Sequence, residues 1–157
     1  MDIVQFNDNI VKPTLDYLGL NNLTPQRLLI GTALTESKLM YLRQLGNGVA
    51  LGLYQMEPNT EKDIWENYLA FKPELKEKML ELMGNKLKID TNPMLYNLLY
   101  STAMTRIHYL RVKEALPNGD DAMALALYHK KYYNSMLGAT DPKESVKNFE
   151  IAIKLIK

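Results

Sequence analysis

The sequence contains no cysteine, which excludes disulfide bonds, thiolate nucleophiles and thiolate metal sites. Histidine is scarce too, since His108 and His129 are the only two. They are not at ligand spacing on one helix, so we expect no metal site. No Ser-His-Asp constellation and no phosphate-binding glycine loop stands out, and we expect no cofactor.

An excess of one charge and long apolar runs are also missing. Nineteen Lys and Arg residues against 18 Asp and Glu residues give a formal net charge of +1. Such a balance does not favour binding to nucleic acid, which we do not expect as a partner. No apolar run approaches the roughly 20 residues that span a bilayer, so we expect no membrane insertion. Residues Met1–Phe6 lack the basic and apolar regions of a secretory signal.

The remaining composition is that of an ordinary globular protein, with 46% hydrophobic and 24% charged residues. A length of 157 residues fits one domain, residues 1–157. Apolar residues recur at helical spacing and no period-2 alternation is sustained, which predicts an all-α domain of about seven helices.

Turn signals place the expected helices. They are 8–18, 25–40 with Thr24 as N-cap, 61–69 after a Thr60–Asp63 capping box, 73–83, one long helix from Asp90–Pro93 to about Leu116, 122–128, and a last helix opened by Asp141-Pro142. The 122–128 helix is apolar on every side and is expected to be central. Residues Val49–Met56 form either a short strand or an irregular loop.

One carboxylate lies on an apolar stripe. Leu29, Ala33, Glu36 and Met40 follow helical spacing on one face, near a helix end and before a glycine-containing loop. Burial would raise the pKa of Glu36 and keep the acid protonated for donation to a glycosidic oxygen. The alternative is a slightly different helix rotation, with Glu36 simply solvated.

Three segments together carry a family resemblance. They are Glu36-Ser37, then Gly52-Leu53-Tyr54-Gln55 followed by Pro58 and Thr60, and finally Leu127-Tyr128-His129. In this combination the chain resembles the lytic transglycosylases of lysozyme-like fold over residues 23–133. It departs from the family with Tyr54 in place of methionine, His129 in place of asparagine, Lys130-Lys131 in place of Ala-Gly, and Val49 in place of glycine.

The resemblance implies a lysozyme-like helical domain whose substrate is the peptidoglycan glycan strand. Glu36 would protonate the oxygen between N-acetylmuramic acid and N-acetylglucosamine. It would then act as base toward the C6 hydroxyl of the same muramoyl residue, leaving a 1,6-anhydro end. No second protein carboxylate is needed, because the substrate's acetamido group stabilises the cation.

The residues around the motifs are candidates for substrate binding. Gln55 would hydrogen-bond a sugar, Tyr54 would offer its ring to a sugar face, and Met56 adjoins both. The alternative is a loop that packs on the core. Ser37 would orient Glu36 or line the cleft, or equally satisfy a helix-end carbonyl.

Two further candidates come from the late motif. Tyr128 would place its hydroxyl beside the carboxyl of Glu36, unless it is an ordinary core tyrosine. His129 shares a face with Ala122, Leu125 and Ala126 and therefore points into a packed region, either as a core histidine or as part of the cleft.

Three rival functions stay open. The first is a hydrolytic lysozyme of the same fold, in which Glu57 or Asp63 activates water. The second is a non-catalytic virion or cell-wall-binding protein. The third is a helical interaction domain.

The expected setting is the bacterial cell wall, reached without a signal peptide. A bacteriophage endolysin released through a holin-type pore fits this setting, as does a virion component with other virion proteins as partners. A bacterial secretion or conjugation system is the remaining alternative.

Overall fold

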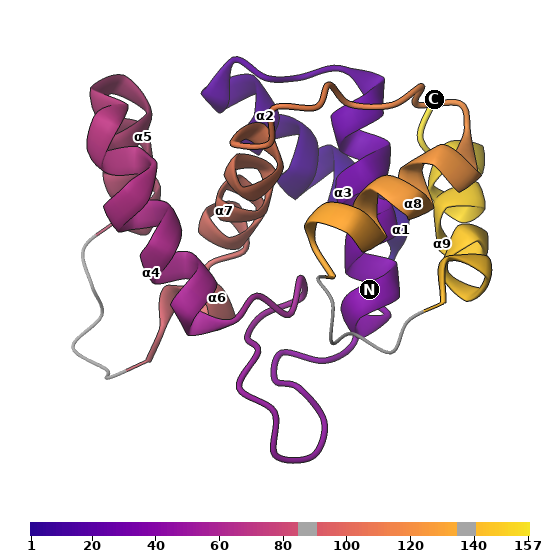
Figure 1. The fold of residues 1–157 in the computed structure, drawn as a ribbon, viewed down its shortest axis with the longest axis horizontal. Helices are drawn as coiled ribbons and strands as arrows, with labels where there is room; N and C mark the ends of the chain where they lie inside the picture. Colours follow the sequence, from indigo (N-terminus) through magenta and orange to yellow (C-terminus); the bar gives the residue numbers. More distant parts are fainter. Residues whose placement is uncertain (85–90, 135–140) are drawn as a thin grey trace.

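The computed structural model describes residues 1–84, 91–134 and 141–157 (Figure 1). Within these ranges the chain is mostly helical and has no strand, which confirms the all-α prediction. The elements are α1 (Ile3–Phe6), the π-helical η1 (Asn7–Val11), α2 (Lys12–Leu18), α3 (Leu23–Ser37), α4 (Pro58–Asn67), the 3-10 helix η2 (Leu69–Phe71), α5 (Pro73–Met83), α6 (Pro93–Tyr96), α7 (Leu98–Leu110), α8 (Ala122–Tyr132) and α9 (Pro142–Leu155). None of the described helices is long and apolar enough to cross a membrane.

Helix α3 is the central element of the larger core. Its residues from Pro25 to Ala33 are all buried, and α8 and α9 lie against it (Figure 1). Gly31 allows the close approach of α9, since a Cβ atom there would lie 2.2 Å from the ring of Phe149. Phe149 is itself completely buried in this core. The contact between Gly31 and Phe149 therefore sets the distance between α3 and α9.

A second core lies among α4, α5, α6 and α7 and is fixed by a buried polar network. The hydroxyl of Tyr100 donates to Glu61 Oε1 at 2.5 Å, and Asn92 Nδ2 donates to Glu61 Oε2 at 2.8 Å. Trp65 Nε1 donates to the Tyr100 hydroxyl at 2.9 Å. Both carboxylate oxygens of Glu61 are thus satisfied, as burial of a charge requires.

The segment between α3 and α4 is an irregular loop, which decides between the two alternatives for residues 49–56. Its only regular pairings are the isolated bridges Arg43–Leu51 and Leu51–Met56. Gly52 adopts φ +73°, donates its N–H to Leu42 O at 2.8 Å, and packs against the backbone of Met94 at the start of α6. The loop therefore connects the end of α3 to the second core.

Several helix ends differ from the predictions. Helix α3 begins earlier because Asn22, rather than Thr24, accepts the capping bond, from Thr24 N at 3.0 Å. It ends at Ser37, short of Met40, because Lys38 takes the left-handed conformation. The Thr60–Asp63 capping box is wrong, since α4 starts at Pro58 without a side-chain cap.

The predicted long helix is divided in the structure. Asn97 separates α6 from α7 and caps α7 by accepting from Tyr100 N at 3.0 Å, and α7 ends at Leu110. Asp90, the expected start, lies outside the described residues. The first helix starts earlier than expected, at Ile3.

Helix α8 is only half-buried, not buried all round as predicted. Met123 is 42% exposed and Leu127 is 52% exposed. The central, nearly fully buried helix is α3 instead.

We expect Gly52→Ala to destabilise the fold far more than Gly19→Ala. Both glycines have nearly the same φ, +73° and +72°, but a Cβ at Gly52 would lie 2.2 Å from Met94 O, whereas nothing lies within 4 Å at Gly19. The backbone strain alone costs about 1–2 kcal/mol. Urea unfolding should show that loss for Gly19→Ala and a loss at least about 2 kcal/mol larger for Gly52→Ala. Equal losses would contradict the role of the Gly52–Met94 contact.

Candidate functional site

Glu36 lies in the last turn of α3, where the central helix meets the loop. Its side chain is 15% exposed, and its Oε1 is 2.9 Å from His129 Nε2 and 3.4 Å from Asn134 Nδ2. Of the predicted stripe, Leu29 and Ala33 are fully buried, while Met40 lies beyond the helix and is 67% exposed. Glu36 is therefore a largely buried acid at the rim of the core rather than a freely solvated one.

His129 is a core residue and also the partner of Glu36. Its side chain is 1% exposed, and its ring stacks on Tyr133 with centroids 5.7 Å apart and contacts Phe149 at 5.8 Å. With the proton on Nε2, neutral His129 donates to the Glu36 carboxyl. Of the two alternatives that the sequence left open, His129 is the core histidine, and it adjoins the cleft only through its hydrogen bond to Glu36.

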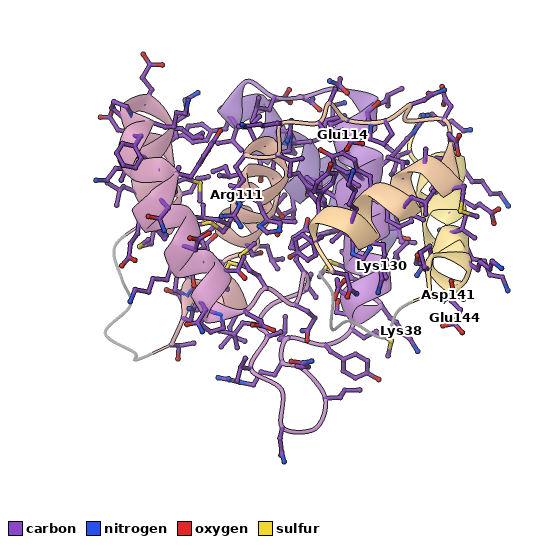
Figure 2. All side chains as sticks on the ribbon, in the orientation of Figure 1. Lys38, Arg111, Glu114, Lys130, Asp141 and Glu144 are labelled. Atoms are coloured by element: carbon purple, nitrogen blue, oxygen red, sulfur yellow. The ribbon has the colours of Figure 1, made fainter. Side chains whose placement is uncertain are left out.

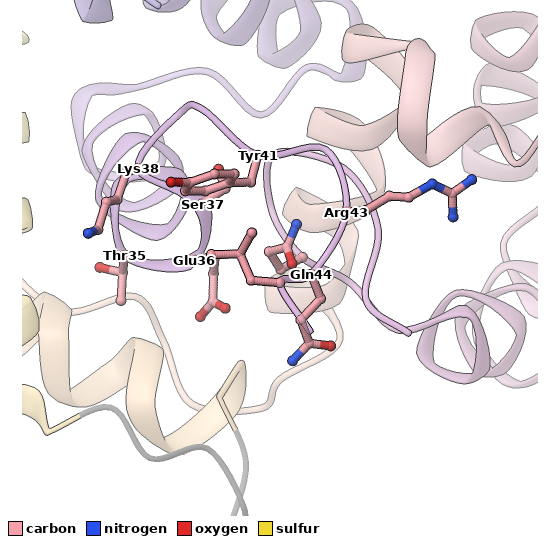
Figure 3. A pocket seen from close by; sticks show the side chains of 9 residues that line it. Thr35, Glu36, Ser37, Lys38, Tyr41, Arg43 and Gln44 are labelled. Atoms are coloured by element: carbon pink, nitrogen blue, oxygen red, sulfur yellow. The ribbon is translucent and has the colours of Figure 1, made fainter. Parts of the chain in front are cut away.

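A cleft of about 260 Å³ opens beside Glu36 (Figure 3). Its lining residues are Thr35, Glu36, Ser37, Lys38, Tyr41, Arg43, Gln44, Leu45 and Gln55. Figure 3 shows the Glu36 carboxyl group pointing into the open space, with Gln44 across from it on the loop. Among these lining residues Glu36 is the only acid, and Lys38 and Arg43 are the only cations.

The Glu-Ser pair and the Gly52–Gln55 motif meet at this cleft. Ser37 Oγ lies 2.6 Å from Leu53 O and 3.2 Å from Ala33 O, so the hydroxyl satisfies carbonyls and joins the end of α3 to the loop. Gln55 has φ +49°, and its Nε2 donates to Gly52 O at 2.8 Å. Such strain concentrates at functional sites. Gln55 thus faces the cleft in a fixed orientation.

Three of the predicted sugar contacts are wrong. Tyr54 is completely buried with its hydroxyl 3.0 Å from Thr102 Oγ1, and Met56 is 3% exposed in the second core. Neither side chain can reach a sugar. The Tyr128 hydroxyl donates to Glu114 O at 3.0 Å. Figure 2 shows Glu114 at the opposite end of the molecule from Lys38, the neighbour of Glu36 in the cleft.

The sequence analysis missed the lining residues Lys38, Arg43 and Gln44, and it also missed Tyr133 and Asn134 beside the cleft. The Tyr133 hydroxyl donates to Tyr54 O at 2.8 Å, and burial, followed by the negative charge of Glu36, raises the Tyr133 pKa well above its usual value. Asn134 Nδ2 approaches Glu36 Oε1. Tyr133 follows His129 by four residues, which places both on one helix face. This spacing could have predicted that Tyr133 lies beside His129.

The two alternative carboxylates do not line the cleft. Asp63 pairs with Arg111 Nη1 at 2.5 Å and accepts from Asn67 Nδ2 at 2.8 Å, and these two bonds, Asn67 first, lower its pKa. Glu57 is exposed at the start of α4. The structure therefore brings neither of them to Glu36.

Comparisons of the chain with protein-family models, curated proteins and solved structures gave no match. The resemblance to the lytic transglycosylases consequently depends on the motifs in the sequence.

His108 lies behind the site as a buried neutral imidazole. Its Nε2 donates to Tyr132 O at 2.9 Å, its Nδ1 accepts from Arg111 Nη2 at 3.1 Å, and its ring meets that of Tyr133 edge-on at 5.0 Å. Burial, and next the positive charge of Arg111, lower its pKa from 6.5 to about 4.

We therefore expect protonation of His108 to destabilise the protein in acid. Between pH 6.5 and about 4 the unfolded chain binds a proton at His108 that the folded chain does not, so the free energy of unfolding falls as the pH falls. The loss attributable to His108 is about 3 kcal/mol by pH 4. Urea unfolding at several pH values should show a shallower dependence for His108→Gln, whose amide retains a donor for Tyr132 O. Parallel pH profiles would contradict the assignment.

Proposed function

We propose that this protein is a peptidoglycan lytic transglycosylase of lysozyme-like fold, with Glu36 as the single acid and base. The observation that carries the proposal is the Glu36 carboxyl group, hydrogen-bonded to His129 at 2.9 Å while it faces an open cleft. Support also comes from the meeting of the Glu36-Ser37 and Gly52–Gln55 motifs at this cleft.

In the first step Glu36 donates a proton. The His129 N–H occupies Oε1, which leaves Oε2 to carry the acidic hydrogen toward the cleft. That hydrogen passes to the glycosidic oxygen as the bond from this oxygen to C1 of the muramoyl residue breaks. The acetamido group of the same sugar stabilises the positive charge at C1. Glu36 is left as a carboxylate.

In the second step the Glu36 carboxylate takes the hydrogen of the muramoyl C6 hydroxyl as O6 bonds to C1. The product is a 1,6-anhydro sugar, and Glu36 regains its proton. Hydrogen bonds from His129 and Asn134 are stronger to a carboxylate than to a carboxylic acid. They therefore stabilise the charge that develops in the transition state of the first step.

A one-carboxylate route is favoured over hydrolysis by the placement of the other acids. Asp63 is engaged by Arg111 and Asn67, and Glu57 is not a lining residue of the cleft. A hydrolase of the two-carboxylate type would need a second carboxylate positioned to activate water. In this proposal the enzyme acts on the bacterial wall, as a phage endolysin or a virion component.

We expect Glu36→Gln to abolish cleavage while Glu57→Gln retains it. Both changes remove one carboxylate and keep the side-chain shape, but only Glu36 faces the cleft. The release of soluble fragments from isolated sacculi, followed by mass spectrometry, should fall at least about 10³-fold for Glu36→Gln. Anhydro-muropeptides should be released by the wild type and by Glu57→Gln. Retained activity in Glu36→Gln, or its loss in Glu57→Gln, would overturn the assignment.

We further expect His129→Phe to lower kcat by about 10²-fold, the effect typical of one lost donor to a developing anion. His129→Gln retains an N–H donor and should stay within about tenfold of the wild type. Thermal unfolding of both variants separates this effect from misfolding, since Phe suits a site lined by Tyr133 and Phe149. A fully active and stable His129→Phe would show that the bond to Glu36 is not used.

A further inference from the structure

The cleft carries positive charge on both sides of Glu36. Figure 3 shows Lys38 on one side of the Glu36 carboxyl group and Arg43 on the other. In the part of the chain that the structure describes, the ion pairs are Arg27–Asp120, Lys62–Glu66, Arg111–Asp63 and Lys131–Glu114, and Glu36 is hydrogen-bonded to His129. Lys38 and Arg43 take part in none of these pairs.

Backbone interactions fix the main chain at both residues, while their charged side chains are exposed. Lys38 is the C-cap of α3 in the left-handed conformation, φ 55°, and its N–H donates to Leu34 O at 3.1 Å. Arg43 is paired with Leu51 in a bridge, and the neighbouring Gln44 N donates to Ala50 O at 3.1 Å. Two exposed cations on a fixed backbone outnumber the single acid of the cleft lining, Glu36, so the charge of the lining is net positive.

A neutral sugar polymer has no charged group that Lys38 and Arg43 could bind. Strands containing muramic acid differ from neutral β-1,4 glycans of the chitin type by carboxylates, either on the lactyl group or at the end of an attached stem peptide. Arg and Lys side chains bind carboxylates through charge-assisted hydrogen bonds. The lining residues Gln44 and Gln55 supply uncharged amides for the sugars between the two cations.

We propose that Lys38 and Arg43 bind substrate carboxylates on the two sides of the cleaved bond and so select acidic glycan strands over neutral ones. This inference rests on the proposed function, because it assigns the substrate class of the same cleft. The two residues bind substrate and transition state equally, so they affect KM and leave kcat unchanged.

The test compares Lys38→Gln, Arg43→Gln and the double variant with the wild type on three substrates. These are strands with stem peptides, strands stripped of peptides but retaining lactyl carboxylates, and a neutral N-acetylglucosamine oligosaccharide. We expect KM for the acidic strands to rise about threefold in each single variant and about tenfold in the double variant. Added salt should raise KM for the wild type and have less effect on the double variant.

Lys113→Gln is the matched control, since it removes one exposed positive charge away from the cleft. KM should be unchanged in this control, and cleavage of the neutral oligosaccharide should be equal in all variants. An effect confined to peptide-bearing strands locates the bound carboxylate on the stem peptide. An effect confined to the stripped strands locates it on the lactyl group, and an effect on both acidic substrates shows that either carboxylate is bound. Unchanged KM, or an equal rise with the neutral substrate, would overturn the proposal.

A binding measurement separates this inference from the proposed function. If wild-type protein cleaves none of the three substrates, the transglycosylase proposal fails. Co-sedimentation with insoluble, peptide-bearing sacculi still tests the two cations in that case. Weaker sedimentation of the double variant than of Lys113→Gln would retain the inference, and equal sedimentation would refute it.

Discussion

The hydrogen bond between Glu36 and His129 joins two helices whose residues are 93 positions apart in the sequence. It forms only if the last turn of α3 and the last turn of α8 are at a fixed distance, and Phe149 of α9 sets that distance by packing on both Gly31 and His129. A hydrogen bond to a charged group contributes about 1.5–3 kcal/mol, and an unpaired buried partner costs at least as much. The packing of α3, α8 and α9 and the chemistry of the Glu36 carboxyl group thus both depend on the Glu36–His129 hydrogen bond.

The second constraint is the attachment of the loop to this helix end. Ser37 Oγ approaches Leu53 O, the Tyr133 hydroxyl donates to Tyr54 O, and the Gly52 N–H donates to Leu42 O. These bonds place Gln55 and the loop residues opposite Glu36. Most of the motif residues are therefore buried and hold the loop in position beside the cleft. Of the motif residues, only Glu36 and Gln55 present functional groups to the cleft.

The sequence was sufficient for the all-helical class and for the position of Glu36, because both depend on local periodicity and on one helix end. It was insufficient for side chains whose direction depends on distant partners. Tyr54 and Tyr128 turn away from the cleft because their hydroxyl groups form hydrogen bonds elsewhere, that of Tyr54 with Thr102 Oγ1 and that of Tyr128 to Glu114 O. No local pattern encodes those partners. The break at Asn97 was missed because apolar residues continue at helical spacing through it, while its capping bond to Tyr100 N is visible only in the structure. His129 stands where the lytic transglycosylases that the sequence resembles have asparagine, and only the three-dimensional arrangement reveals its bond to Glu36.

The most direct test of a one-carboxylate, non-hydrolytic reaction follows the oxygen of water. Sacculi digested by the wild-type protein in water enriched in ¹⁸O should give muropeptides whose new ends are 1,6-anhydro sugars without the heavy isotope, because O6 of the sugar, not water, bonds to C1. Incorporation of ¹⁸O at C1 of the new ends would contradict this reaction and would establish hydrolysis in its place.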